Sequence, residues 1–185
     1  MAMIKEKLLK KGISLTGLLI TIALVAFIFF ILLPALKMAK EYGRITACAS
    51  NQKQIALAIQ MYAQEHDGTM PQTVNFWSDI GTSGKILKCP SDNTKVINSY
   101  GQNSSINGLK IKKIDDPIET ILTADASPDD GNILSIENGD PRHGGYIIVS
   151  YLDGHIGRLG STKDFPSSIE ARSNTISNGE TETKP

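Results

Sequence analysis

The first feature of the chain is a long apolar run, from Ile13 to Leu33, that contains no ionisable side chain. At about 1.5 Å per residue, a helix of that length reaches roughly 30 Å, the thickness of the hydrocarbon core of a bilayer. A helix satisfies its own backbone hydrogen bonds and is therefore stable in lipid. The sequence predicts a transmembrane helix over residues 13–36.

Beyond Pro34 the hydrophobic positions recur at steps of three and four, which is the period of one helix face. Asp67-Gly68 and then Met70-Pro71 supply residue types that end a helix. We expect residues 37–66 to form the amphipathic half of the same helix, which Pro34 would kink or loosen. The predicted buried stripe consists of Ile45, Cys48, Gln52, Ile55, Ile59 and Tyr62, widened by Ala49, Ala56 and Ala63.

Short strands and turns follow the helix. The segment from Ile118 to Ala124 is rich in β-formers, and Tyr146 to Leu152 is apolar on both faces. A third strand, His155 to Leu159, follows Asp153-Gly154, a two-residue hairpin turn signal. An antiparallel sheet packed on the amphipathic helix buries both surfaces, so we predict an α+β domain over residues 67–160.

The two ends of the chain are polar. Residues 1–12 form a basic leader with four lysines and one glutamate, and hydrophobic residues nearly vanish over residues 161–185. That composition predicts a disordered tail. The formal net charge of the whole chain is zero, which gives no electrostatic footprint for nucleic acid, so we expect no nucleic-acid partner.

A cleaved secretory signal peptide is the competing interpretation of the apolar run. Such a signal has an apolar region of about 7 to 15 residues and then a cleavage site with small residues. Here the run continues through Pro34 into Lys37-Met38-Ala39-Lys40-Glu41 without such a site. We therefore expect the apolar segment to stay attached to the domain that follows it.

The junction Lys11-Gly12-Ile13-Ser14-Leu15-Thr16-Gly17 resembles the leader junction of type IV prepilins and type II secretion pseudopilins. The usual form is a basic residue and Gly, then an apolar residue, Thr or Ser, Leu, an aliphatic residue and Glu. Gly12 to Leu15 match this form, whereas Thr16 and Gly17 do not. The resemblance implies a pilin-like fold and cleavage by a prepilin-type peptidase, with Lys11, Gly12 and Ile13 as the processing residues.

Later landmarks resemble a bacterial branch of these pilin-like proteins. They include Arg44 to Ile55, Cys89-Pro90-Ser91-Asp92, Ala124-Asp125 and Arg142-His143-Gly144. The closing signature of that branch is a His, nine residues, then Asp-Gly, which here runs from His143 to Asp153 and Gly154. The resemblance implies a single-pass protein of the bacterial cytoplasmic (inner) membrane, with a cytoplasmic N-terminus and a periplasmic or extracellular domain.

The chain has two cysteines, Cys48 and Cys89. A domain outside the cytoplasmic membrane meets an oxidising environment, in which the pair could form a disulfide. That bridge would close a loop of about 40 residues and contribute roughly 3 to 4 kcal/mol. The alternative is two unlinked buried thiols. The wide spacing lacks a Cys-x-x-Cys motif, so we expect neither a metal-ligand pair nor a redox pair.

His143, Asp153, His155 and Asp125 are residue types that bind metals or transfer protons. A strand over residues 146–152 covers about 20 Å and would hold His143 and Asp153 at opposite ends. They could not share one metal or one proton, so we predict that the protein is not an enzyme.

Calcium is the one cofactor that the sequence brings into consideration. Asp125, Asp129 and Asp130 offer hard oxygen ligands at close spacing, which suits Ca²⁺. An acidic turn with hydrogen-bonded caps explains the same residues, so we expect no cofactor.

The function predicted from these features is structural. We expect a minor pseudopilin or accessory subunit of a type II secretion or type IV pilus-like fibre. Its partners would be a prepilin-type peptidase, other pilin or pseudopilin subunits and the lipid bilayer. The alternative is a cell-surface binding module, held by an uncleaved helix, that presents the sheet and residues 71–116 to a ligand. A third hypothesis is an anchored hydrolase that uses His143 or His155.

Overall fold

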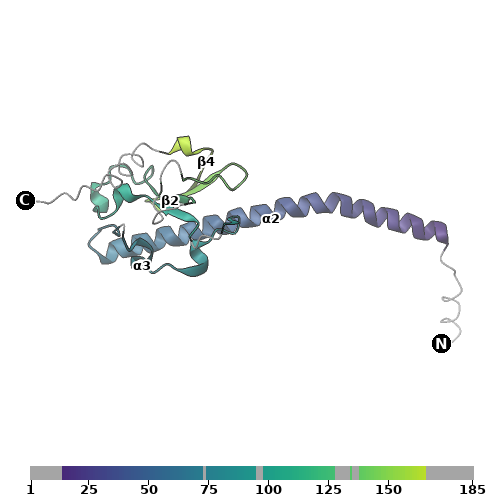
Figure 1. Cartoon of the computed structure of the whole chain (residues 1–185), viewed down its shortest axis with the longest axis horizontal. Helices are drawn as coiled ribbons and strands as arrows, with labels where there is room; N and C mark the ends of the chain where they lie inside the picture. Colours follow the sequence, from purple (N-terminus) through teal and green to yellow (C-terminus); the bar gives the residue numbers. More distant parts are fainter. Residues whose placement is uncertain (1–13, 73, 95–97, 128–133, 135–137, 166–185) are drawn as a thin grey trace, which may run out of the picture. The chain divides into compact units, whose positions relative to one another are not determined.

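The computed structural model describes residues 14–72, 74–94, 98–127, 134 and 138–165, and Figure 1 shows their arrangement into helices and strands. The predicted α+β fold is confirmed: one long helix precedes a small antiparallel sheet. The chain divides into a first unit that ends at Lys40 and a second unit that begins at Glu41. The helices are α2 (Leu15–Glu65) and α3 (Phe76–Asp79), and the strands are β1 (Tyr100–Gln102), β2 (Ile121–Asp125), β3 (Ile147–Tyr151) and β4 (Ile156–Leu159).

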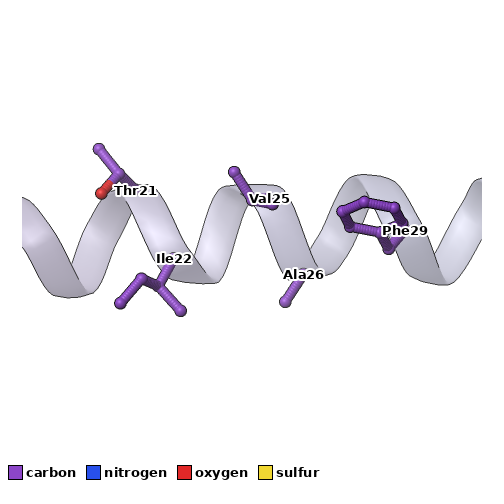
Figure 2. Close-up of a pocket in the computed structure, with 5 residues that line it drawn as sticks. All are labelled: Thr21, Ile22, Val25, Ala26 and Phe29. Carbon is purple, nitrogen blue, oxygen red and sulfur yellow. The ribbon is translucent and has the colours of Figure 1, made fainter.

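In the first unit, α2 is an exposed apolar helix with Pro34 in its interior. Figure 2 shows one flank, where Ile22, Val25 and Phe29 follow one another at helical spacing. The hydroxyl of Thr21 donates a hydrogen bond to the Leu18 carbonyl at 2.8 Å, so this polar group is satisfied within the helix. By length and composition, the helix could cross a membrane.

In the second unit, α2 buries a stripe that matches the predicted one. The helix ends at Glu65, as predicted, because Asp67 and Gly68 both adopt positive φ angles, of 54° and 75°. The Gly68 amide donates to the Ala63 carbonyl at 2.7 Å and so closes the helix end. The buried residues of α2 are Cys48, Gln52, Ile55, Ala56, Ile59 and Ala63.

The four strands lie in the order β1-β2-β3-β4, and every neighbouring pair is antiparallel. One hydrophobic cluster combines Leu122 and Ile148 with the buried stripe of α2, and a second contains Ala124 and Val149. The sheet is therefore buried on both faces, with α2 on one of them.

A bulge in β2, between Ile121 and Thr123, sets which side chains face α2. Leu122 packs in the cluster with α2, and the next residue also faces the helix: the Thr123 hydroxyl donates to the Gln52 side-chain carbonyl at 3.1 Å. Normal alternation then resumes, which brings Asp125 to the same side as Thr123.

The described structure departs from the predicted elements in several places, and β2 begins three residues later than predicted, at Ile121 instead of Ile118. Strand β1 was not predicted; Gly101 fits there because an added Cβ would lie 2.9 Å from the Leu134 Cα. The loop between β3 and β4 has four residues, Leu152 to His155, two more than predicted, and the Tyr151 amide donates to the His155 carbonyl across it at 3.0 Å. The predicted tail boundary after residue 160 was also wrong, because Phe165 is buried in the second cluster. The rest of the tail, residues 166–185, lies outside the described residues, as do Lys11, Gly12 and Ile13.

Candidate functional site

Four side chains from separate parts of the chain meet inside the second unit: Cys48, Cys89, Asp125 and His143. We call them the Cys-Asp-His cluster. One sulfur, oxygen or nitrogen atom from each lies within 4.8 Å of the others. The residues are 0%, 0%, 0% and 2% exposed, respectively. The cluster is therefore a set of potential metal ligands or proton carriers held away from solvent.

Close contacts link the members of the cluster. The Cys48 thiol donates to Asp125 Oδ1 with a sulfur–oxygen distance of 3.0 Å. Cys89 Sγ lies 3.3 Å from His143 Nε2, and His143 Nε2 lies 3.4 Å from Asp125 Oδ2. The histidine nitrogen thus contacts both a sulfur and a carboxylate.

Local structure explains how each member reaches the cluster. Cys48 lies on the buried stripe of α2, and Asp125 ends β2 on the side that faces this helix. Cys89 begins a turn in which the Asp92 amide donates to the Cys89 carbonyl at 3.0 Å. His143 precedes β3, and the Gly144 that follows has a φ of 68°, a backbone angle that favours glycine.

The two thiols differ in acidity because they share one hydrogen bond. That bond lowers the pKa of the Cys89 thiol to about 5, helped by hydrogen bonds from His143 and from the Ser91 backbone. It raises the pKa of the Cys48 thiol, and burial raises that pKa further. Cys89 is therefore the more acidic thiol of the pair.

The pKa values of His143 and Asp125 are also shifted by burial and by their neighbours in the cluster. Burial lowers the pKa of His143, but its contact with Cys89 and the charge of Asp125 raise that pKa above its ordinary value. Burial raises the pKa of Asp125 to about 6, although the Cys48 thiol and the Ile148 amide donate hydrogen bonds to it. The cluster combines a thiol of lowered pKa with an imidazole of raised basicity.

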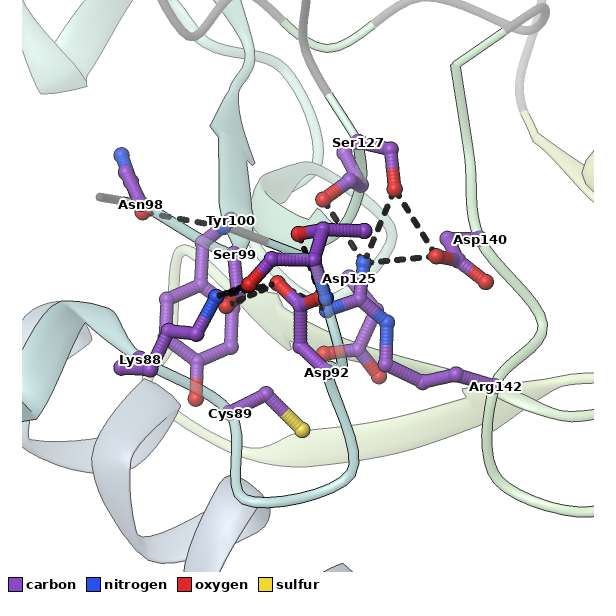
Figure 3. A network of polar contacts seen from close by, with 12 residues as sticks. Lys88, Cys89, Asp92, Asn98, Ser99, Tyr100, Asp125, Ser127, Asp140 and Arg142 are labelled. Atoms are coloured by element: carbon purple, nitrogen blue, oxygen red, sulfur yellow. Dashed lines mark hydrogen bonds and ion pairs between the residues drawn. The ribbon is translucent and has the colours of Figure 1, made fainter. Parts of the chain in front are cut away.

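A buried ionic network lies beside the cluster (Figure 3). The Arg142 side chain is 5% exposed, and its guanidinium lies 3.1 Å from Asp92 Oδ2 and 2.9 Å from Asp140 Oδ2. The Lys88 ammonium also contacts Asp92, at 3.1 Å, and Ser99 donates its hydroxyl to the same carboxylate. Burial raises the pKa of Asp92, but hydrogen bonds from Ser99, Thr94 and Lys88 hold that pKa below its usual value. The network is a charged support for the loops that carry Cys89 and His143.

The two ends of the predicted His-to-Asp-Gly signature lie in different places. His143 belongs to the buried cluster, whereas Asp153 is exposed in the turn after β3 and accepts a hydrogen bond from the His155 amide at 2.9 Å. The expectation that His143 and Asp153 do not share a site is confirmed. Lys53 and Gln60 of α2 donate to the carbonyls of Gly154 and Leu152, so this turn is attached to the helix.

Replacing Gly154 with alanine should destabilise this turn. Gly154 has a φ of 87°, and an added Cβ would lie 3.1 Å from Gln60 Nε2. A positive φ costs a residue with a Cβ roughly 1–2 kcal/mol, so we expect the free energy of unfolding to fall by about that amount. Urea titration of the full chain in mild detergent, followed by fluorescence of the single tryptophan, measures it. Gly160→Ala is the control, since Gly160 has an ordinary φ; equal losses would contradict the prediction.

The cysteine and calcium predictions have different outcomes. Cys48 and Cys89 are free thiols here, brought close together by the fold, and a disulfide between them stays a prediction. The expectation that the two cysteines are neither a metal-ligand pair nor a redox pair stays a prediction, although the fold places Asp125 and His143 beside them. The Asp125 carboxylate points into this cluster, whereas Asp129 and Asp130 lie outside the described residues, so the calcium site stays untested.

No family model, curated protein or solved structure matches the chain. What the fold and the site define is a small α+β domain on a helix that could cross a membrane, with a buried Cys-Asp-His cluster where the helix meets the sheet.

Proposed function

We propose that the protein is a membrane-anchored, pilin-like structural protein that serves as a minor pseudopilin or accessory subunit of a type II secretion or type IV pilus-like fibre. The observation that carries this proposal is the continuity of α2, Leu15–Glu65. Its first part is apolar and exposed, and its second part buries one face against the sheet of the domain. One helix thus supplies both a membrane anchor and the spine of the domain.

The processing junction supports the same function. Lys11, Gly12 and Ile13 resemble the prepilin cleavage site immediately before the apolar helix. Cleavage there by a prepilin-type peptidase would leave Ile13 as the N-terminus, at the cytoplasmic face of the inner membrane. The domain would then lie in the periplasm or outside the cell.

Gly17 supports a minor rather than a repeating role. The resemblance places a glutamate at this position, where its carboxylate would pair with the positive N-terminus of a neighbouring subunit. Gly17 offers no carboxylate, and a charged amine left unpaired in the bilayer costs several kcal/mol. Among the described residues, an added Cβ would meet only Ser14, at 3.9 Å, so space does not explain the glycine. A subunit at the fibre tip avoids this cost because it receives no neighbour's amine.

The mass of the N-terminal peptide from the cell-derived protein tests the proposal. We expect a chain that begins at Ile13, with or without N-methylation. A Gly12→Val variant should instead keep its leader, because the bulkier residue blocks the peptidase. Gly43→Ala is the control: Gly43 lies beyond the apolar run, and this variant should be processed normally.

The same mass spectrometry, applied to sheared and purified fibres, gives the abundance of the chain. We expect it to be scarce relative to a major subunit. A natural protein that still begins at Met1 would contradict processing and favour a surface binding module on an uncleaved helix. Finding the chain as the dominant repeating subunit would contradict the role that we assign to Gly17.

A further inference from the structure

We propose that the Cys-Asp-His cluster binds one Zn²⁺ ion as a closed structural site with four protein ligands. The ligands are Cys48 Sγ, Cys89 Sγ, His143 Nε2 and one carboxylate oxygen of Asp125. Sulfur and imidazole ligands suit zinc, whereas calcium and magnesium prefer sites made of oxygen. This inference stands apart from the proposed function, because it needs only the folded second unit.

The spacing of the four ligand atoms suits tetrahedral coordination. With metal–ligand bonds of about 2.0–2.3 Å, the ligands of a tetrahedral zinc lie roughly 3.3–3.8 Å apart. Cys89 Sγ lies 3.3 Å from His143 Nε2, and the two oxygens of Asp125 lie 3.0 Å from Cys48 Sγ (Oδ1) and 3.4 Å from His143 Nε2 (Oδ2). With one oxygen of Asp125 counted, all four ligand atoms lie within 4.8 Å of one another. Small side-chain adjustments would therefore complete the site without a change in fold.

The charge balance also suits a divalent ion. Around a bound Zn²⁺ ion, two thiolates, one carboxylate and a neutral imidazole leave a single negative charge on the site. Any proton still carried by a ligand sulfur or by His143 Nε2 is released to solvent as the bond to zinc forms. The buried Arg142 guanidinium interacts with the charge of Asp125 and so offsets this remaining negative charge.

The outer nitrogen of His143 is an independent indication of a ligand. His143 Nδ1 is buried and has no hydrogen-bond partner among the described residues. The Glu41 carboxylate lies 3.7 Å from it and is itself held by the Ser91 hydroxyl at 2.9 Å. A zinc on Nε2 fixes the proton on Nδ1, and a carboxylate is the usual acceptor for that proton. The geometry of Glu41 thus completes a carboxylate–histidine–zinc arrangement.

A Cys48–Cys89 disulfide explains fewer features of the cluster than a zinc site does. It would join Cys48 to Cys89, but it gives no role to an imidazole and a carboxylate buried within contact distance of the sulfurs. Asp125 is also held from outside the cluster, by the Gln52 amide at 3.3 Å and the Ile148 amide at 2.9 Å. Such outer partners orient metal ligands in known sites.

Metal analysis of the full chain tests the proposal. The protein is purified in mild detergent without chelator, and bound zinc and free thiols are measured by mass spectrometry on the same sample. We expect one zinc per chain and no Cys48–Cys89 disulfide. After exchange with Co²⁺, we expect the visible absorption bands of a tetrahedral cobalt ion together with a sulfur-to-cobalt charge-transfer band.

Matched variants separate zinc binding from disulfide formation. His143→Gln keeps both cysteines, so it should lose the zinc and the cobalt bands, whereas a disulfide would survive it. His155→Gln is the control, because His155 is exposed in the turn after β3 and should leave the zinc content unchanged. Glu41→Ala should weaken the zinc affinity roughly 10- to 100-fold, and Glu65→Ala, exposed on the same helix, should not.

Several results would overturn the proposal. These are a Cys48–Cys89 disulfide in the exported protein, free thiols with no bound zinc after incubation with Zn²⁺, or zinc content unchanged in His143→Gln. The cobalt spectrum of the unmodified chain keeps the test decisive if His143→Gln fails to fold, since absent charge-transfer bands would also contradict thiolate ligation.

Discussion

Replacing Arg142 with alanine is expected to lower the free energy of unfolding by roughly 3–5 kcal/mol, the range found when one partner of a buried ion pair is removed. The Arg142 side chain is 5% exposed, and its partner Asp92 is 1% exposed. Arg142 also bridges Asp92 to Asp140 and donates to the Ala126 carbonyl at 2.8 Å. Asp92 keeps contacts with Lys88 and Ser99 in the variant, so we expect the low end of the range.

Urea titration of the full chain in mild detergent measures this loss. Trp77 packs against the main hydrophobic cluster and is the only tryptophan, so its fluorescence reports on unfolding of the domain. Arg158→Ala removes the same side chain from an exposed position on β4 and should change stability by less than about 0.5 kcal/mol. A loss for Arg142→Ala no larger than that for Arg158→Ala would contradict the buried network.

Helix α2 could be predicted from the sequence because its signals are local. The stripe at steps of three and four identified Cys48, Gln52, Ile55 and Ile59 as buried, and the structure buries all four. The end at Glu65 followed from Asp67-Gly68, whose backbone angles are set by those residues themselves. Each signal lies within a few residues of the feature that it predicts.

The sheet was predicted in part for the same reason. Strand β3 has a run of apolar residues and was placed to within one residue at each end. Strand β1 has only three residues, one of them Gly101, and gives no periodic pattern. It is a strand because β2 lies beside it and because Leu134 leaves no room for a side chain at Gly101. Such causes lie in the tertiary structure.

The Cys-Asp-His cluster could not be assembled from sequence, although its members stood in the landmarks that the resemblance identified. Cys48, Cys89, Asp125 and His143 come from four separate segments, and no spacing rule joins them. The bulge in β2 and the buried stripe of α2 together decide that Asp125 and Cys48 face each other. The absence of a Cys-x-x-Cys motif says nothing about Asp125 and His143, because that motif concerns only cysteines that are close together in the sequence.

The hydrophobic stripe correctly predicted that Gln52 is buried, but it did not predict why a polar residue occupies this position. Its amide nitrogen donates to the Ile148 carbonyl at 2.7 Å and to Asp125 Oδ1 at 3.3 Å. Its carbonyl oxygen accepts from the Thr123 hydroxyl at 3.1 Å. One fully buried side chain thus joins α2 to both β2 and β3.

Gln52→Ala should therefore lower the free energy of unfolding by roughly 3 kcal/mol, since it opens a cavity, removes the side-chain donor to the buried Ile148 carbonyl and takes one hydrogen bond from the buried Asp125 carboxylate. Gln52→Met, which keeps the volume but removes the hydrogen bonds, should lose most of the same amount. Gln54→Ala, on the exposed side of the same helix, is the control and should change stability by less than about 0.5 kcal/mol. The Trp77 urea titration measures all three. A Gln52→Met variant as stable as the natural chain would mean that Gln52 acts by filling space, and not by joining the helix to the sheet through hydrogen bonds.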